Sequence, residues 1–130
     1  MTKPILCVDF DGVIHSYKSG WKGTTTISDP PVEGAFAFLL DALEYFDVCI
    51  YSSRSSQPGG ITAMKQWLYV ECGPDYWFGS PDAPGLENLR FPAQKPAAFL
   101  TIDDRAICFD GDWSKLRPAD LLNFKPWNKS

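Results

Sequence analysis

Residues 4–12 read PILCVDFDG, an apolar run that ends abruptly in two aspartates and a glycine. Short apolar runs with a β-branched and aromatic bias are typical of buried strands, and a glycine after them marks a turn. The stretch therefore predicts a strand over residues 4–10 that runs out into a loop. Because the chain leaves the strand between Asp9 and Asp11, both carboxylates can reach the same cleft.

Two further apolar runs end in polar side chains in the same way. DVCIYSS (47–53) is followed by Arg54, and AAFLTI (97–102) is followed by Asp103 and Asp104. Helical spacing of apolar residues predicts one helix from near Pro31 to residue 46 and another over ITAMKQWLYVE (61–71), capped by a glycine.

Alternation of strands and helices predicts an α/β fold, a Rossmann-like parallel sheet with helices on both faces. In such sheets ligands bind beyond the carboxyl ends of the strands. At 130 residues we expect a single domain over 1–130. Its remaining segments are predicted as loops over 12–31 and 73–88, strands over 89–91 and 106–109, and a late helix over 118–124.

Composition narrows the classes of function. The formal net charge is −4, which gives no basic footprint for tight binding along a nucleic-acid backbone. The four cysteines show no CxxC pairing, and Cys7, Cys49 and Cys108 lie in apolar runs, so we expect reduced core residues. With no apolar run of about 20 residues and acidic residues close to the N-terminus, we expect a cytoplasmic protein without a membrane segment.

The carboxylates at the predicted sheet edge require either a cation that neutralises them or protonation of some of the groups. Two like charges about 4 Å apart repel by roughly 4 kcal/mol at an effective dielectric near 20. If the two strand ends are neighbours, Asp9 and Asp11 meet Asp103 and Asp104, and oxygen ligands of this kind favour Mg²⁺. Lys95 can supply a second positive charge.

In combination these stretches resemble a known family. VDFDGVI (8–14), YSSR (51–54), Lys95 and TIDDRA (101–106) are similar to the four motifs of the haloacid dehalogenase (HAD) superfamily, in the same order. The resemblance spans about residues 5–105 and suggests a small phosphatase-like member with a minimal cap or none.

The resemblance implies a Mg²⁺-dependent phosphohydrolase acting through an aspartyl-phosphate. Asp9 would attack phosphorus, and Asp11 would protonate the leaving oxygen and then activate water. Ser52 would hydrogen-bond the phosphoryl group, and Lys95 would hold its charge. The implied ligands of Mg²⁺ are the carboxylate of Asp9, the backbone carbonyl of Asp11, and Asp103 and Asp104.

The resemblance implies a phosphorylated substrate. Nucleotides or nucleic-acid ends are the leading expectation, and phosphoproteins and small sugar phosphates remain open. Aromatic residues and lysines alternate in HSYKSGWKG (15–23), a pattern that can stack a base or simply pack the loop. Arg54 would grip phosphate or form a surface ion pair, and His15 also reads as a loop contact. The candidates for substrate binding are Gly12, His15, Tyr17, Trp21, Ser53 and Arg54.

Three other functions remain open from the sequence. One is a phosphotransferase that uses the same Asp9 nucleophile. The others are a receiver-like signalling module and a phosphate-binding module without turnover. Receiver domains carry an acidic pair after the first strand, whereas here the pair comes late. The sequence leaves the oligomeric state open.

Overall fold

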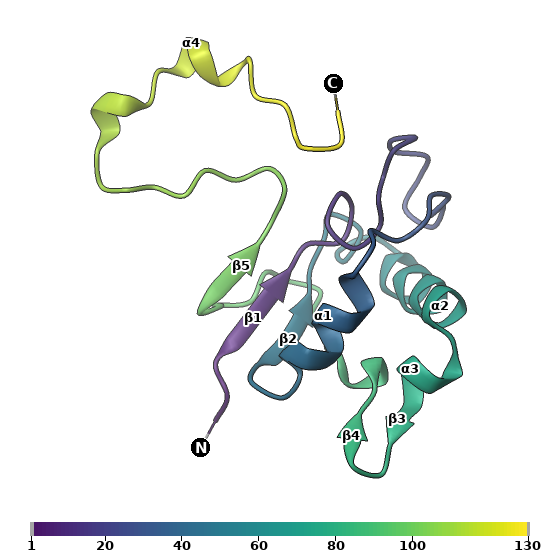
Figure 1. Cartoon of the computed structure of the whole chain (residues 1–130). Coiled ribbons are helices and arrows are strands. Elements are labelled where there is room, and N and C mark those ends of the chain that lie inside the picture. The colour runs from purple at the N-terminus through teal and green to yellow at the C-terminus, as the bar shows by residue number, and fades with distance from the viewer. Residues whose placement is uncertain (1, 130) are drawn as a thin grey trace.

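A three-stranded parallel sheet forms the centre of the fold. The computed structural model describes residues 2–129. Strand β1 (Ile5–Val8) lies between β2 (Asp47–Ile50) and β5 (Leu100–Ile102), with Cys7 in register with Cys49 on one side and Thr101 on the other (Figure 1). The three main strand predictions are confirmed, although each strand is shorter than its apolar run.

Two helices pack on the sheet. Helix α1 (Ala35–Ala42) begins later than predicted, because Gly34 has a left-handed backbone with φ of 87° and the helix starts only after it. Helix α2 (Gly60–Cys72) ends at Gly73, as the sequence predicts. Both helices bury an apolar stripe, from which Leu39, Met64 and Leu68 have at most 1% of their surface exposed.

The apolar core lies on one side of the sheet. Alternate strand residues Leu6, Val8, Val48 and Ile50 join the buried residues of α1 and α2 in a single cluster. The prediction of helices on both faces is therefore wrong for the described chain. The segment 91–99, which crosses to β5, forms no helix and contains two prolines, each of which lacks a backbone donor.

The Cys7 and Cys49 side chains alternate with those of the core cluster. Both are buried and free of disulfides, as predicted, and Cys49 accepts a hydrogen bond from Nη2 of Arg90 at 3.3 Å. Cys108 is exposed, contrary to the prediction of a core position.

Residues 73–91 are more ordered than the predicted loop. They form α3 (Pro74–Phe78), an antiparallel pair of β3 (Gly79–Ser80) with β4 (Ala83–Pro84), and the 3₁₀ turn η1 (Leu86–Asn88). The strand predicted over 89–91 is reduced to one bridge between Arg90 and Cys49. The α3 aromatics explain the order, since Trp77 and Phe78 each pack edge-on against Tyr69 of α2.

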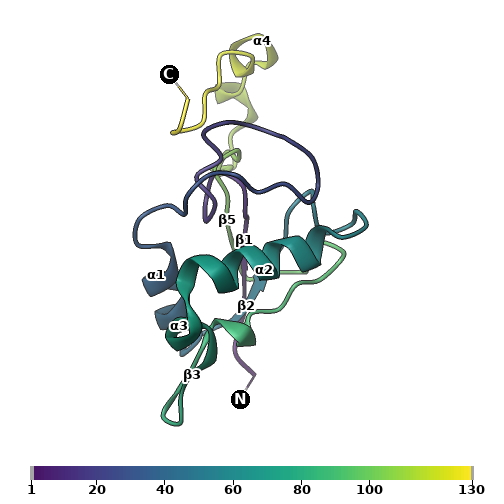
Figure 2. The ribbon, with the colours of Figure 1, turned by 90° about the vertical axis from the view of Figure 1, so that its right-hand side faces the viewer.

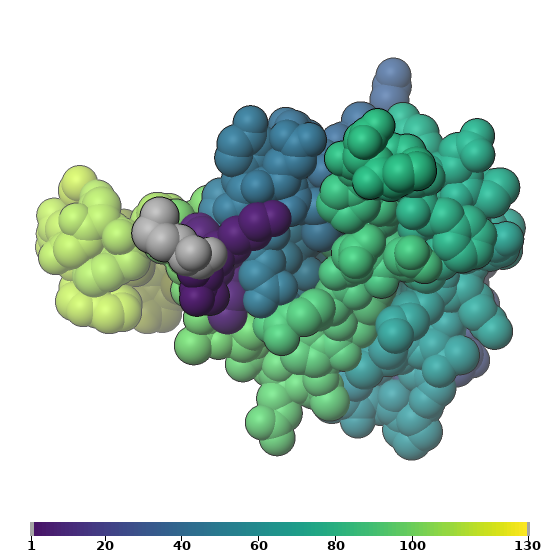
Figure 3. Space-filling view, turned by 90° about the horizontal axis from the view of Figure 1, so that it is seen from below, coloured from purple at the N-terminus to yellow at the C-terminus, as the bar shows by residue number. Residues whose placement is uncertain are grey.

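Residues 105–129, called the C-terminal arm below, lead away from the sheet (Figure 2). Only at their end do they meet the loop after β1, where Trp127 and Asn128 donate to the carbonyls of Gly12 and Ser16. They contain η2 (Trp113–Lys115) and α4 (Pro118–Leu121), while the strand predicted over 106–109 is absent from this described segment. Seen from below, the arm forms a yellow-green lobe beside the body (Figure 3).

The C-terminal arm buries little apolar surface. Residues 106–109 therefore have no apolar core against which a strand could pack. Its large apolar residues are exposed, among them Ile107, Phe109, Trp113, Leu122 and Phe124. Within residues 2–129 no helix combines the length and the hydropathy that a membrane crossing requires.

Candidate active site

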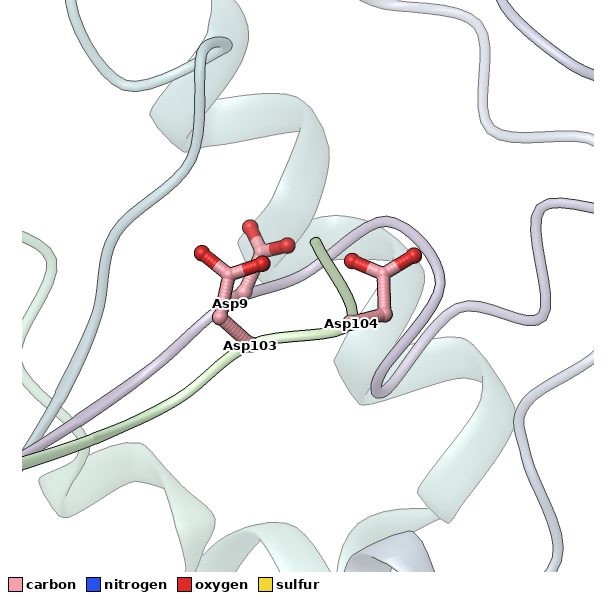
Figure 4. Close-up of side chains that lie close together, drawn as sticks. All are labelled: Asp9, Asp103 and Asp104. Carbon is pink, nitrogen blue, oxygen red and sulfur yellow. The ribbon is translucent and has the colours of Figure 1, made fainter. Parts of the chain in front are cut away.

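The carboxyl ends of β1, β2 and β5 meet at one edge of the sheet. The backbone N–H of Asp9 donates to the carbonyl of Ile102 at 2.9 Å, and that of Tyr51 donates to the carbonyl of Val8 at 3.1 Å. These bonds bring the residues that follow the three strands together. The carboxylates of Asp9, Asp103 and Asp104 point to the same side of the sheet edge (Figure 4).

These three aspartates form a compact oxygen cluster. One carboxylate oxygen from each of Asp9, Asp103 and Asp104 lies within 4.8 Å of the others. The side chain of Asp104 is only 3% exposed, and neither of its oxygens has a hydrogen-bond partner among the described residues. A buried carboxylate without hydrogen-bond partners is costly, and a bound cation is the usual remedy. The donor set therefore fits a hard divalent cation.

Like charge and burial act strongly on Asp9. Burial, together with the neighbouring charges of Asp103 and Asp104, raises the pKa of Asp9 from 3.8 to about 8. Without a cation, Asp9 therefore keeps its proton in the folded protein up to a pH of about 8. Cation binding must displace that proton.

Gly12 allows Asp104 to approach the first loop. Its φ is +84°, and a Cβ built on it would collide with the Asp104 carboxylate. The sequence identified Gly12 as a substrate contact, but the structure gives it a different neighbour, the acidic cluster.

We expect Gly12→Ala to destabilise the protein by at least about 2 kcal/mol, because left-handed strain is added to overpacking. Gly20→Ala is the matched control, since Gly20 has φ of +81° and nothing within 4 Å of its added Cβ. Urea unfolding of both variants measures the difference. Equal losses would show that the contact with Asp104 is unimportant.

Two adjoining cavities open onto the cluster. One of about 260 Å³ is lined by Asp9, Asp11, Tyr17, Ser52, Ser53, Asp103, Asp104 and Arg105. The other, of about 170 Å³, shares Asp9, Ser52, Ser53 and Asp103 and adds Lys95. Ser52 is buried, and Lys95 makes no ion pair within the described chain. The predicted Asp9, Asp11, Ser52 and Lys95 are thus brought together with the acidic pair.

Asp11 is held by two basic side chains. Its Oδ2 accepts from Nε of Arg54 at 2.9 Å, and its Oδ1 pairs with Nδ1 of His15 at 2.8 Å. Burial would raise the pKa of Asp11, but the hydrogen bonds from His15 and Arg54 outweigh it and hold that pKa below its ordinary value.

Arg54 is not a phosphate-gripping residue in this structure. It is completely buried, and its side chain donates to Asp11 and to three backbone carbonyls. Both earlier interpretations of Arg54, a substrate clamp and a surface ion pair, are therefore wrong. The segment SSR looked polar and exposed, and no feature of the sequence showed that a loop would close over it.

Of the aromatic residues in the loop 15–23, only some face the site. Tyr17 lines the larger cavity and adopts φ of 59°, rare for a residue with a side chain. His15 is 1% exposed and accepts the N–H of Asp29, so it is a loop contact rather than a substrate ligand. Trp21 lies over the Arg54 guanidinium at 4.6 Å, which occupies one face of its ring.

Two residues at the site escaped the sequence analysis as functional residues. Arg105 reaches the cavity wall, and its Nε lies 3.8 Å from Asp104. Trp127, at the end of the C-terminal arm, donates to the carbonyl of Gly12 at 2.7 Å. Arg105 could have been suspected from its place after the acidic pair. No local sequence pattern marked Trp127, because its contact is with Gly12, which is far away in the sequence.

Comparison with protein-family models, with curated proteins and with solved structures finds no match for this chain. What stands on structural grounds is a small α/β fold with a three-stranded parallel sheet and a cluster of aspartates at its carboxyl edge.

Proposed function

We propose that this protein is a Mg²⁺-dependent phosphohydrolase of the HAD type, without a substantial cap, that acts on phosphomonoesters. The observation that carries the proposal is the buried Asp104 carboxylate, which accepts no hydrogen bond from the described residues and lies beside Asp9 and Asp103. Such a cluster is suited to a cation that also binds a phosphate, and Lys95 and Ser52 line the adjoining cavity.

Asp9, Asp103 and Asp104 would hold the Mg²⁺. When bound, the ion supplies positive charge for the phosphoryl oxygens and keeps Asp9 ionised. It thereby removes the obstacle that the raised pKa of Asp9 presents to a nucleophile.

The proposed reaction has two steps. In the first, an Asp9 oxygen forms a bond to phosphorus as the bond to the leaving oxygen breaks, and Asp11 gives that oxygen a proton. In the second, Asp11 takes a proton from water as the water oxygen attacks phosphorus, and the Asp9–phosphorus bond breaks. Ser52 and Lys95 contact the phosphoryl oxygens in both steps.

Asp11 suits the second step better than the first as it stands in this structure. Because His15 and Arg54 lower its pKa, Asp11 is ionised at neutral pH, the form that accepts a proton. To act as an acid it must gain a proton against its two basic partners. We therefore expect the first step to be the harder one for substrates with basic leaving groups.

The substrate class follows from the rim of the larger cavity. Tyr17 offers an aromatic ring and Arg105 a half-exposed guanidinium, a pair that suits a phosphate ester with a flat or anionic leaving group. Nucleotides and nucleic-acid ends belong to this class, and we propose them as the first substrates to test.

The test is phosphate release by the native chain from aryl phosphates, nucleotides and oligonucleotides with 5′- or 3′-terminal phosphate. We expect release in millimolar Mg²⁺ and none after the metal is removed with EDTA. Equal release with and without metal would overturn the role of Mg²⁺. Silence over the whole set, with phosphate binding retained, would favour a module without turnover.

A further inference from the structure

The side chain of Arg54 joins three parts of the site that are far apart in the sequence. We propose that Arg54 is a positioning residue that fixes the Asp11 carboxylate and anchors the loop at residues 23–26 beside it. The effect of Arg54 on catalysis rests on the proposed function. Its effect on the position of Asp11 and of residues 23–26 does not.

All three nitrogens of the Arg54 guanidinium donate hydrogen bonds within the protein. Nε and Nη2 donate to the two oxygens of Asp11, at 2.9 and 3.2 Å. Nη1 donates to the carbonyls of Gly23, Thr24 and Thr26, at 2.9, 2.7 and 3.3 Å. Since the side chain has no exposed surface, these bonds are not exchanged for water.

The backbone of Arg54 reaches the phosphate side of the site. Its N–H donates to Oγ of Ser52 at 3.0 Å, which leaves the hydroxyl proton of Ser52 free to point at a ligand. Behind it, a Cβ added to Gly60 would collide with the carbonyl of Arg54, so the chain is closely packed there. One residue thus orients the serine on one side and the acid–base group on the other.

His15 completes the grip on Asp11. Its Nε2 accepts the backbone N–H of Asp29 at 3.0 Å, so the ring proton is on Nδ1, which donates to Oδ1 of Asp11. The carboxylate is held in place from two directions, and its rotation is blocked. The arrangement aligns Asp11 with the larger cavity, which it lines.

Lysine cannot replace this arginine. A planar guanidinium presents five donors in a fixed fork, whereas an ammonium presents three on a flexible stem. Trp21, which stacks on the guanidinium at 4.6 Å, would lose a flat partner as well. Arg54→Lys therefore keeps the charge and removes the geometry.

The first test compares leaving groups. Because Asp11 protonates the leaving oxygen, misplacing it should harm alkyl phosphates more than 4-nitrophenyl phosphate, whose leaving group needs no proton. We expect Arg54→Lys to lower kcat for an alkyl phosphate by at least about 10-fold more than for 4-nitrophenyl phosphate. Arg90→Lys, at an arginine whose side chain is 56% exposed, is the matched control and should leave the ratio unchanged. Equal losses on both esters would reduce Arg54 to a merely structural residue and overturn the positioning role.

The second test does not use activity. We expect Arg54→Lys and Asp11→Asn each to speed amide hydrogen exchange in residues 20–28 and to leave α2 unaffected. Unchanged exchange in residues 20–28 would overturn the anchoring of residues 23–26 by Arg54. If the native chain released no phosphate from any ester, the proposed function would fall, and this exchange experiment alone would decide the geometric inference.

Discussion

Asp9→Asn should release phosphate at least about 10³-fold more slowly than the native protein, and it should unfold at a higher temperature when no metal is present. The loss follows from removal of the nucleophile, whose place no other group at the site can take. The gain in stability has a separate cause. An amide at this position is neutral without having to bind a proton, so it avoids the cost of burial and of repulsion from Asp103 and Asp104 that raises the pKa of Asp9.

Asp82→Asn is the matched control, because Asp82 is exposed in the turn between β3 and β4 and makes the same change of charge. It should alter neither activity nor melting temperature appreciably. Activity that survives in Asp9→Asn would eliminate the covalent mechanism. A melting temperature below that of the native protein would show that the aspartates do not repel one another as the structure indicates.

Magnesium should raise the melting temperature, and more so at pH 8 than at pH 5. The pKa of Asp9 is raised from 3.8 to about 8 in the folded protein. Between these values the folded state keeps a proton that the unfolded chain has lost, so stability without metal falls as pH rises through this range. Bound Mg²⁺ replaces that proton. The stabilisation by Mg²⁺ is therefore larger at pH 8, where Asp9 loses its proton readily, than at pH 5.

A ligand at 100 times its dissociation constant adds about 2.7 kcal/mol, which for a domain of this size corresponds to a shift on the order of 10 °C. Thermal unfolding followed by circular dichroism, in EDTA and in excess Mg²⁺ at both pH values, measures it. Asp9→Asn, which lacks one ligand, should show a smaller shift. A shift that is absent at both pH values would exclude a metal site at these aspartates.

The sequence was sufficient for the parts of the site that lie at strand ends. Apolar runs locate strands, and parallel strands bring their carboxyl ends to one edge, so Asp9, Ser52 and Asp103 had to meet if the runs were neighbours. The start of α1 was less predictable, because the apolar pattern begins before Gly34 while the helix begins after it.

Long-range burial of polar groups could not be predicted from local patterns. Arg54 sits between serines in a segment that reads as exposed, and its burial depends on carbonyls contributed by residues 23–26. In the same way, the second face of the sheet carries no helix because the described segment 91–99 forms none, and the neighbours of that segment in space are set by the whole fold. Composition and periodicity describe only the neighbours of a residue along the sequence, not its neighbours in space.

The central position of β1 has a consequence for how the protein folds during its synthesis. Its two partners, β2 and β5, begin at Asp47 and Leu100, so one side of β1 stays unpaired until the chain has been synthesised past Ile102. Closing so long a loop costs entropy before its contacts repay it, which slows folding. A nascent chain can pair β1 with β2 early, but it exposes the other edge of β1 until β5 arrives. The aspartate cluster, which spans that junction, would then form only after β5 has paired with β1.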